Sequence, residues 1–355
     1  TPGWRGAGVS FSKIAVGLAR AGHDVRLIAG AAEVAERFAA TGVPVDLVPT
    51  GDTGRREVAA VRRILAGQRA QVVLADAPRD VRIARYASLA RRRAIIWRYN
   101  LHGRRLATDV LQRWLFGGVS RVVHQSRYSA ERLKADTPWL GHLPVDIIYN
   151  GIDVATLLPS PERGRAFRTR HGIAAHAAQI VTPTSAQPEK AVSVAQGAVT
   201  RLGAARPITW LIADADPSLA APGVRTLPPG RMSPEELPDA LRAADVVLLP
   251  GAHELFGNAT AEAMALECCV VAADGGATPE VVGDGGVLFA AGDAAAAAHE
   301  EAALLDDPAR RAELGAAARR RIGGAFTLAA MENGYERVLR ESAARVAGSR
   351  SLRQG

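Results

Sequence analysis

The sequence of 355 residues is poor in cysteine, lysine, methionine and aromatic residues. Its two cysteines, Cys268 and Cys269, are neighbours, so they supply neither a disulfide framework nor a spaced set of metal ligands. No apolar run approaches the ~20 residues that a transmembrane helix needs, which excludes a membrane-spanning enzyme. No secretory signal is visible, and we expect a cytoplasmic protein.

The chain is long enough for two domains, and its charge is divided unevenly. Residues 1–150 carry 24 basic and 12 acidic side chains, whereas residues 151–355 carry 20 and 24. A positive field in the first half favours an anionic partner, such as an acidic acceptor or an anionic membrane surface. A merely solvated basic face is the alternative. The basic cluster lacks interleaved aromatic residues and any recognisable motif, so we expect no nucleic-acid partner.

Apolar strands alternate with amphipathic helices along nearly the whole chain. This pattern predicts an α/β protein with two Rossmann-like, doubly wound parallel sheets. The expected strands are 24–29, 45–49, 71–75, 94–99, 121–125 and 145–149 in the first half, then 179–183, 208–213, 224–227, 246–249, 270–273 and 287–289.

The turn signal at Asn150-Gly151 indicates a linker between the halves. We therefore expect domains at 1–150 and 151–325. Residues 326–355 are expected to form a terminal helix that packs back towards the first domain and frays from Gly348.

The first expected helix begins near Gly8, and only a short segment lies ahead of it. In a doubly wound sheet such a helix follows a strand. We expect the first strand to be missing from this chain, which would leave the first sheet without a central member.

Residues 253–262 read His-Glu-Leu-Phe-Gly-Asn-Ala-Thr-Ala-Glu and are the most informative segment. They follow the buried strand 246–249 and open a helix, so they lie at the carboxyl end of a strand, where ligands bind. The first N–H groups of that helix are unpaired donors that attract a diphosphate. The flanking carboxylates of Glu254 and Glu262 can accept hydrogen bonds from the vicinal hydroxyls of a sugar and a ribose. The alternative is a capping acid and a solvated helix residue.

Several further motifs resemble the donor-binding domain of glycosyltransferase family 4, the retaining transferases of GT-B architecture. They are Asn150-Gly-Ile-Asp153, Pro188-Glu-Lys190, 233–237, 262–265, 274–276 and 279–282. The resemblance implies two Rossmann-like domains that face a cleft. It also implies transfer of a sugar from a nucleoside diphosphate sugar to an acceptor with retention, without a metal or other cofactor.

The resemblance further implies roles on the donor side. Glu254 would contact the donor sugar, Glu262 would take the ribose hydroxyls, and Lys190 would neutralise the departing diphosphate. The remaining donor contacts would come from Phe256, Gly257, Asn258, Ala259 and Thr260 at the sugar and diphosphate, Gly230 and Arg231 at the base, and His253 at the sugar. For His253, a structural role is the alternative.

In the first domain the resemblance is looser. It places Gly6 and Gly8 where the family has a glycine-rich loop. Arg98, Asn100 and His102 follow a strand and are candidates for the wall of the acceptor site, with His102 as a candidate catalytic residue. The acceptor itself would be a sugar or a glycolipid, bound by a cytoplasmic protein that is peripheral at the inner face of the membrane.

Three departures separate the chain from the family pattern. Ser185 stands where an Arg usually shares the phosphate charge, and Glu267 and Cys269 replace a usual Gly and Pro. We expect the helix end near Glu267 to differ in shape. These departures keep a weakly active or non-catalytic homologue as an alternative, and a nucleotide-sugar epimerase of the same architecture is another.

Overall fold

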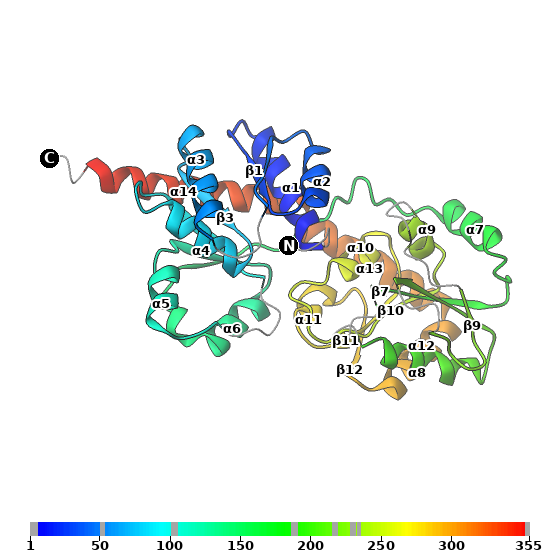
Figure 1. Ribbon diagram of the computed structural model, residues 1–355. Helices are drawn as coiled ribbons and strands as arrows, with labels where there is room; N and C mark the ends of the chain where they lie inside the picture. The colour runs from blue at the N-terminus through cyan, green and yellow to red at the C-terminus, as the bar shows by residue number, and fades with distance from the viewer. Residues whose placement is uncertain are drawn as a thin grey trace. The chain divides into compact units, whose positions relative to one another are not determined.

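The computed structural model describes residues 6–49, 54–100, 106–185, 191–214, 219–227, 232 and 236–351. It divides into two compact units, which are coloured along the chain in Figure 1. Unit 1 comprises residues 1–151 and 328–355, and unit 2 comprises Ile152–Thr327. Each unit is built from parallel strands with flanking helices, which confirms the expected fold class.

Unit 1 holds two separate parallel sheets. The smaller sheet pairs β1 (Leu27–Ala29) with β2 (Val45–Leu47). The larger sheet has the order β3-β4-β5-β6, formed by Val72–Ala75, Ala94–Arg98, Arg121–His124 and Val145–Ile147. The strand runs expected in this half are all found, but the structure does not join them into one sheet.

Helices cover both sheets of unit 1. They are α1 (Gly6–Arg20), α2 (Ala32–Ala39), α3 (Arg55–Gly67), α4 (Pro78–Ala87), α5 (Val110–Phe116), α6 (Arg127–Asp136), the 3-10 turn η1 (Pro138–Leu140) and α14 (Leu328–Ser351). α14 packs on α1 and on the sheet, where Tyr335 and Met331 join Ile14 and Ile96 in one buried cluster. The helix continues through Ser351.

Unit 2 contains one six-stranded parallel sheet in the order β12-β11-β10-β7-β8-β9. In chain order its strands are β7 (Ala178–Ser185), β8 (Ile208–Asp214), β9 (Arg225–Thr226), β10 (Val246–Leu249), β11 (Val270–Asp274) and β12 (Val287–Ala290). Its helices are α7 (Pro161–Arg170), α8 (Val192–Gly203), α9 (Glu236–Arg242), α10 (Asn258–Ala265), α11 (Thr278–Val282), α12 (Ala294–Asp306) and α13 (Pro308–Ala325). β10 and β11 are central and buried on both faces, as their uninterrupted apolar runs require.

The chain passes between the units twice, at residues 151/152 and 327/328. The two passages run side by side, because Ile152 forms a parallel bridge with Thr327 and donates its N–H to the Phe326 carbonyl at 2.8 Å.

Candidate functional site

The strand order of unit 2 defines where a ligand can bind. From β7 the chain proceeds to β8 on one side, whereas β10 pairs with β7 on the other side. The neighbours β7 and β10 therefore form the topological switch point, and the crevice outside their carboxyl ends is the binding position of open α/β sheets. Residues 253–262 follow β10 directly, so this strand order places them at the switch point.

A helix N-terminus faces this position, as expected from the sequence. α10 begins at Asn258, with Gly257 as its N-cap residue in the left-handed conformation at φ 90°. No side chain caps the helix from Gly257, and the first intrahelical bond runs from the Ala261 N–H to the Gly257 carbonyl at 3.1 Å. The N–H groups of Asn258, Ala259 and Thr260 thus belong to the first turn of the helix. Such a terminus attracts an anion.

Two glycines after β11 hold the backbone of Glu254. The Ala277 N–H donates to the Glu254 carbonyl at 2.8 Å. A Cβ atom added to Gly276 would lie 2.7 Å from that carbonyl oxygen and 2.8 Å from the Glu254 nitrogen. Gly275 is equally close to Ala252. The loop that follows β10 is therefore packed against the loop that follows β11, backbone on backbone, and glycine is required for this approach.

The candidate side chains of this segment differ in exposure. Glu254 and Glu262 are half-buried and His253 is exposed. Thr260 is buried, with its hydroxyl over Gly257. Phe256 is only 2% exposed, and its ring meets Phe326 edge to face at 5.7 Å between centroids. The Phe256 ring thus anchors the loop in the core of unit 2.

Four candidate residues lie outside the described residues: Lys190, His102, Gly230 and Arg231. Ser185 ends β7, where it pairs in register with Asp214 beyond an irregularity in the ladder. This places its backbone at the carboxyl end of the strand that flanks the switch point.

α10 ends at a position whose backbone favours glycine. Glu267 adopts a left-handed conformation with φ 62°, is exposed, and lies 3.7 Å from the Arg319 guanidinium. A residue with a side chain therefore occupies a backbone position that glycine takes at lower cost.

The carboxyl ends of the strands in unit 1 carry a buried polar network centred on Arg98. Its guanidinium donates to Asp76 at 2.7 Å, and to Gln125 and Asn150 at 3.2 Å each. Asn150 also donates to Gln125 at 2.9 Å, and Asn100 donates to the second oxygen of Asp76 at 3.3 Å. The four carboxyl ends of the larger sheet are thereby tied together.

Burial and neighbouring charge shift the pKa values of two side chains in this network, Arg98 and Tyr335. Burial acts to lower the pKa of Arg98, but the carboxylate of Asp76 outweighs it, so the pKa is raised and the guanidinium stays charged. The buried Tyr335 phenol hydrogen-bonds with Arg98, and its burial raises the pKa of Tyr335 to about 12. An ion pair this enclosed fixes geometry more than it adds stability.

Arg98 is 1% exposed, and its side chain holds Asp76 and its neighbours in place. Asn100 is half-buried at the same strand end. Gly6 begins α1, and Gly8 lies in its first turns. Asp76, Gln125 and Asn150 were missed as a group, although Asp76 and Asn150 directly follow predicted strands and Gln125 ends one, which was the available signal.

Neither unit offers a metal site within the described residues, where no three His, Cys, Asp or Glu side chains are grouped to hold an ion. In the same part of the chain, no helix is both long and apolar enough to cross a membrane.

Comparison with known families agrees with this architecture. Residues 5–151 match the family model of the glycosyl transferase 4-like domain, and residues 223–321 match that of the glycosyl transferases group 1. No protein of curated function matches the chain.

Solved structures share the fold over nearly the whole chain. A glycosyltransferase from Rickettsia africae has 14% identity and a TM-score of 0.81, with 96% of this chain and 97% of that one covered. HepE of Anabaena in complex with UDP-glucose has 17% identity, a TM-score of 0.80 and the same coverage. Sucrose-phosphate synthase from Thermosynechococcus elongatus has 16% identity and a TM-score of 0.76, with 95% and 93% covered.

The fold and the two matched domains define an enzyme of the glycosyltransferase class with GT-B architecture. The chain carries a glycosyl transferase 4-like domain in unit 1 and a glycosyl transferases group 1 domain in unit 2.

Proposed function

We propose that this enzyme moves a hexose from a nucleoside diphosphate sugar to a glycolipid or other anionic acceptor, with retention and without a metal. The observation that carries the proposal is the position of residues 253–262 at the switch point of unit 2. There the first turn of α10 takes the diphosphate, Glu262 takes the ribose hydroxyls, and Glu254 takes hydroxyls of the sugar.

The N-terminal amides of α10 and the charge of Lys190 replace a metal ion in this mechanism. Negative charge grows on the diphosphate as the bond to the sugar breaks, so fixed donors aimed at that group lower the barrier most. Retention follows when the acceptor hydroxyl approaches the face from which the diphosphate departs. Two solved complexes of HepE contain UDP and UDP-glucose, and they suggest a uridine nucleotide as the first donor to test.

Calorimetric titration with UDP tests the site directly. Glu262→Ala is expected to weaken UDP binding by about 10–100-fold, because a hydrogen bond to a charged group contributes about 1.5–3 kcal/mol. Glu254→Ala should leave UDP binding within about twofold and reduce the turnover of UDP-glucose, since its partner is the transferred sugar. Glu313→Ala is the control, because Glu313 is a surface carboxylate of unit 2 that is 67% exposed. The site is misassigned when both site variants bind UDP and turn over like the parent.

The acceptor side of the proposal rests on an exposed apolar face of α5. Val110 is 84% exposed, Leu111 53% and Trp114 42%. Trp114 is four residues after Val110 and three after Leu111, so its ring neighbours both side chains on the helix surface. The Arg85 guanidinium lies 4.8 Å from the Trp114 ring centroid, next to this face. Apolar side chains beside arginine suit the interface of an anionic membrane, where a lipid-linked acceptor would reside.

Cosedimentation with vesicles tests this part. The parent should bind vesicles that contain anionic phospholipid and release them at high salt, because screening weakens the attraction of arginine to the surface. Trp114→Ser should lose most of the binding, whereas Leu158→Ser, a change at an apolar residue of unit 2 that is 53% exposed, should not. If both variants bind the vesicles equally, α5 does not contact the membrane.

A further inference from the structure

Phe326 lies where α13 ends and the second passage between the units begins. It is the C-cap residue of α13 and is only 3% exposed. Its carbonyl accepts the N–H of Ile152 at 2.8 Å, and the next residue, Thr327, forms the parallel bridge with Ile152. The backbone of Phe326 therefore holds the two passages together on the side of unit 2.

The ring of Phe326 contacts the loop of residues 253–257 (the donor loop). It meets the Phe256 ring at 5.7 Å between centroids and at an interplanar angle of 65°, the edge-to-face arrangement that aromatic pairs prefer. Phe256 is 2% exposed, so both rings are enclosed within unit 2. One residue thus contacts the segment that carries Glu254 through its side chain and the first passage through its backbone.

Arg321 contacts the Phe326 ring from a second element. Its guanidinium lies 5.8 Å from the ring centroid and donates to the carbonyls of Val281 and Glu280 at 2.8 and 2.7 Å. These carbonyls belong to α11, which directly follows the loop that packs on the backbone of Glu254. Both strand-end loops of the candidate site are therefore connected to Phe326.

Unit 1 fixes the other side of the first passage. Gly151 donates its N–H to the Met331 sulfur at 3.1 Å, and its carbonyl accepts from the Lys13 ammonium at 3.3 Å. Asn150 is part of the buried network of Arg98. The backbone is thus held by unit 1 up to Gly151 and by unit 2 from the next residue on.

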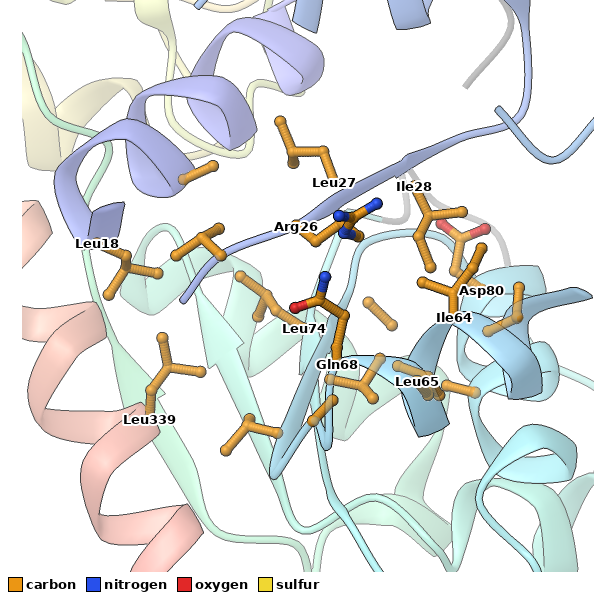
Figure 2. A pocket seen from close by; sticks show the side chains of 18 of the residues that line it. Leu18, Arg26, Leu27, Ile28, Ile64, Leu65, Gln68, Leu74, Asp80 and Leu339 are labelled. Carbon is orange, nitrogen blue, oxygen red and sulfur yellow. The ribbon is translucent and has the colours of Figure 1, made fainter. Parts of the chain in front are cut away.

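The second passage leads into α14, which unit 1 holds along its length. α14 begins at Leu328, and its Met331 and Tyr335 are buried with Ile14 of α1 in one cluster. Leu339 packs on the same cluster and lines the cavity between the two sheets (Figure 2). Only one residue separates the cap of α13 from the start of this anchored helix.

We propose that Phe326 is a positioning residue that couples nucleotide binding at the donor loop to the two passages between the units. A diphosphate bound at the first turn of α10 restrains the donor loop, which ends where that helix begins. Because the two rings are packed together, restraint of Phe256 also restrains Phe326 and the hydrogen bond that it accepts from Ile152. This inference rests on the proposed donor site and adds a residue that acts through Phe256.

Amide hydrogen exchange at Ile152, with UDP as the probe, tests the coupling. An opening of the passage that releases the nucleotide is suppressed by a factor of 1 + [UDP]/Kd, which is about 100 when UDP is present at about 100 times its Kd. We expect UDP to slow exchange of the Ile152 N–H by about 10–100-fold in the parent. In Phe326→Leu, at the same multiple of that variant's own Kd, the slowing should fall to about twofold or less, because leucine keeps the carbonyl and loses the ring that meets Phe256.

Phe167→Leu is the matched control. Phe167 is 1% exposed in α7 of unit 2, and its ring lies 4.2 Å from the His171 ring between centroids, so the change again removes a buried ring with an aromatic neighbour. UDP should still slow exchange at Ile152 as it does in the parent. The N–H of Leu304, a buried residue of α12, serves as a reference, because a variant that only loses overall stability changes its exchange as much as that of Ile152.

Phe256→Leu removes the same contact without changing Phe326, and it should lose the UDP effect at Ile152 to the same extent. The double variant should lose no more than either single one, because both changes remove one shared contact. The coupling is overturned when the slowing at Ile152 survives in Phe326→Leu, or when Phe167→Leu loses it equally. A parent that binds UDP in calorimetry without slower exchange at Ile152 overturns the coupling alone, whereas a parent that binds no UDP overturns the donor site as well.

Discussion

Gly276→Ala is the sharpest test of how the donor loop is held. Gly276 has φ +61°, and an added Cβ would meet the backbone of Glu254 at 2.7 and 2.8 Å and the Ala252 carbonyl at 3.1 Å. The left-handed conformation costs an alanine about 1–2 kcal/mol. Overpacking against backbone that cannot swing aside adds about 1–3 kcal/mol. We expect the free energy of unfolding to fall by about 2–5 kcal/mol.

Gly292→Ala separates the two contributions. Gly292 also lies in unit 2 with φ +84°, but an added Cβ there would meet nothing within 4 Å. This variant should therefore lose only the conformational part, about 1–2 kcal/mol. The difference between the two variants in the free energy of unfolding measures the steric repulsion between the added Cβ atom and the loop that carries Glu254.

Urea unfolding and sugar transfer should be measured on both variants. Displacement of a positioning loop by about 1 Å can cost ~100-fold in rate, so Gly276→Ala should lose at least about tenfold in kcat/KM, while Gly292→Ala stays near the parent. If Gly276→Ala unfolds and turns over like Gly292→Ala, the contact between the two strand-end loops does not position Glu254, and the reasoning fails.

Three further predictions concern stability, each measured by urea unfolding. Glu267→Gly should raise the free energy of unfolding by up to about 1 kcal/mol, because relief of the left-handed strain exceeds a surface ion pair with Arg319, whereas Glu267→Ala should not. Arg98→Met should lower the free energy of unfolding by about 3–5 kcal/mol, because the half-buried Asp76 loses its cationic partner. A change of the exposed Arg91 to Met should have little effect. Glu301 is fully buried, and burial raises its pKa to about 8. Its proton is therefore kept in the folded state and lost from the unfolded state, so stability should fall between about pH 4.5 and 8 by up to about 1.4 kcal/mol per unit, and Glu301→Gln should flatten this slope.

The strands and the start of α10 could be predicted because their signals are local. An uninterrupted apolar run marks a strand buried on both faces, and β10 and β11 are such runs. Gly257 followed by good helix formers marks a helix start, and the structure places that start at Asn258. Both features depend on a few neighbouring residues and need no knowledge of the rest of the fold.

The direction of individual side chains could not be predicted, because distant partners decide it. The Phe256 ring turns inward to meet Phe326, a residue 70 positions later in the chain. Arg98 is buried because Asp76, Gln125 and Asn150 converge on it from three other strand ends. A strand-end position predicts that a polar residue lies near a site. It does not tell whether that residue contacts a ligand or holds in place another residue that contacts the ligand.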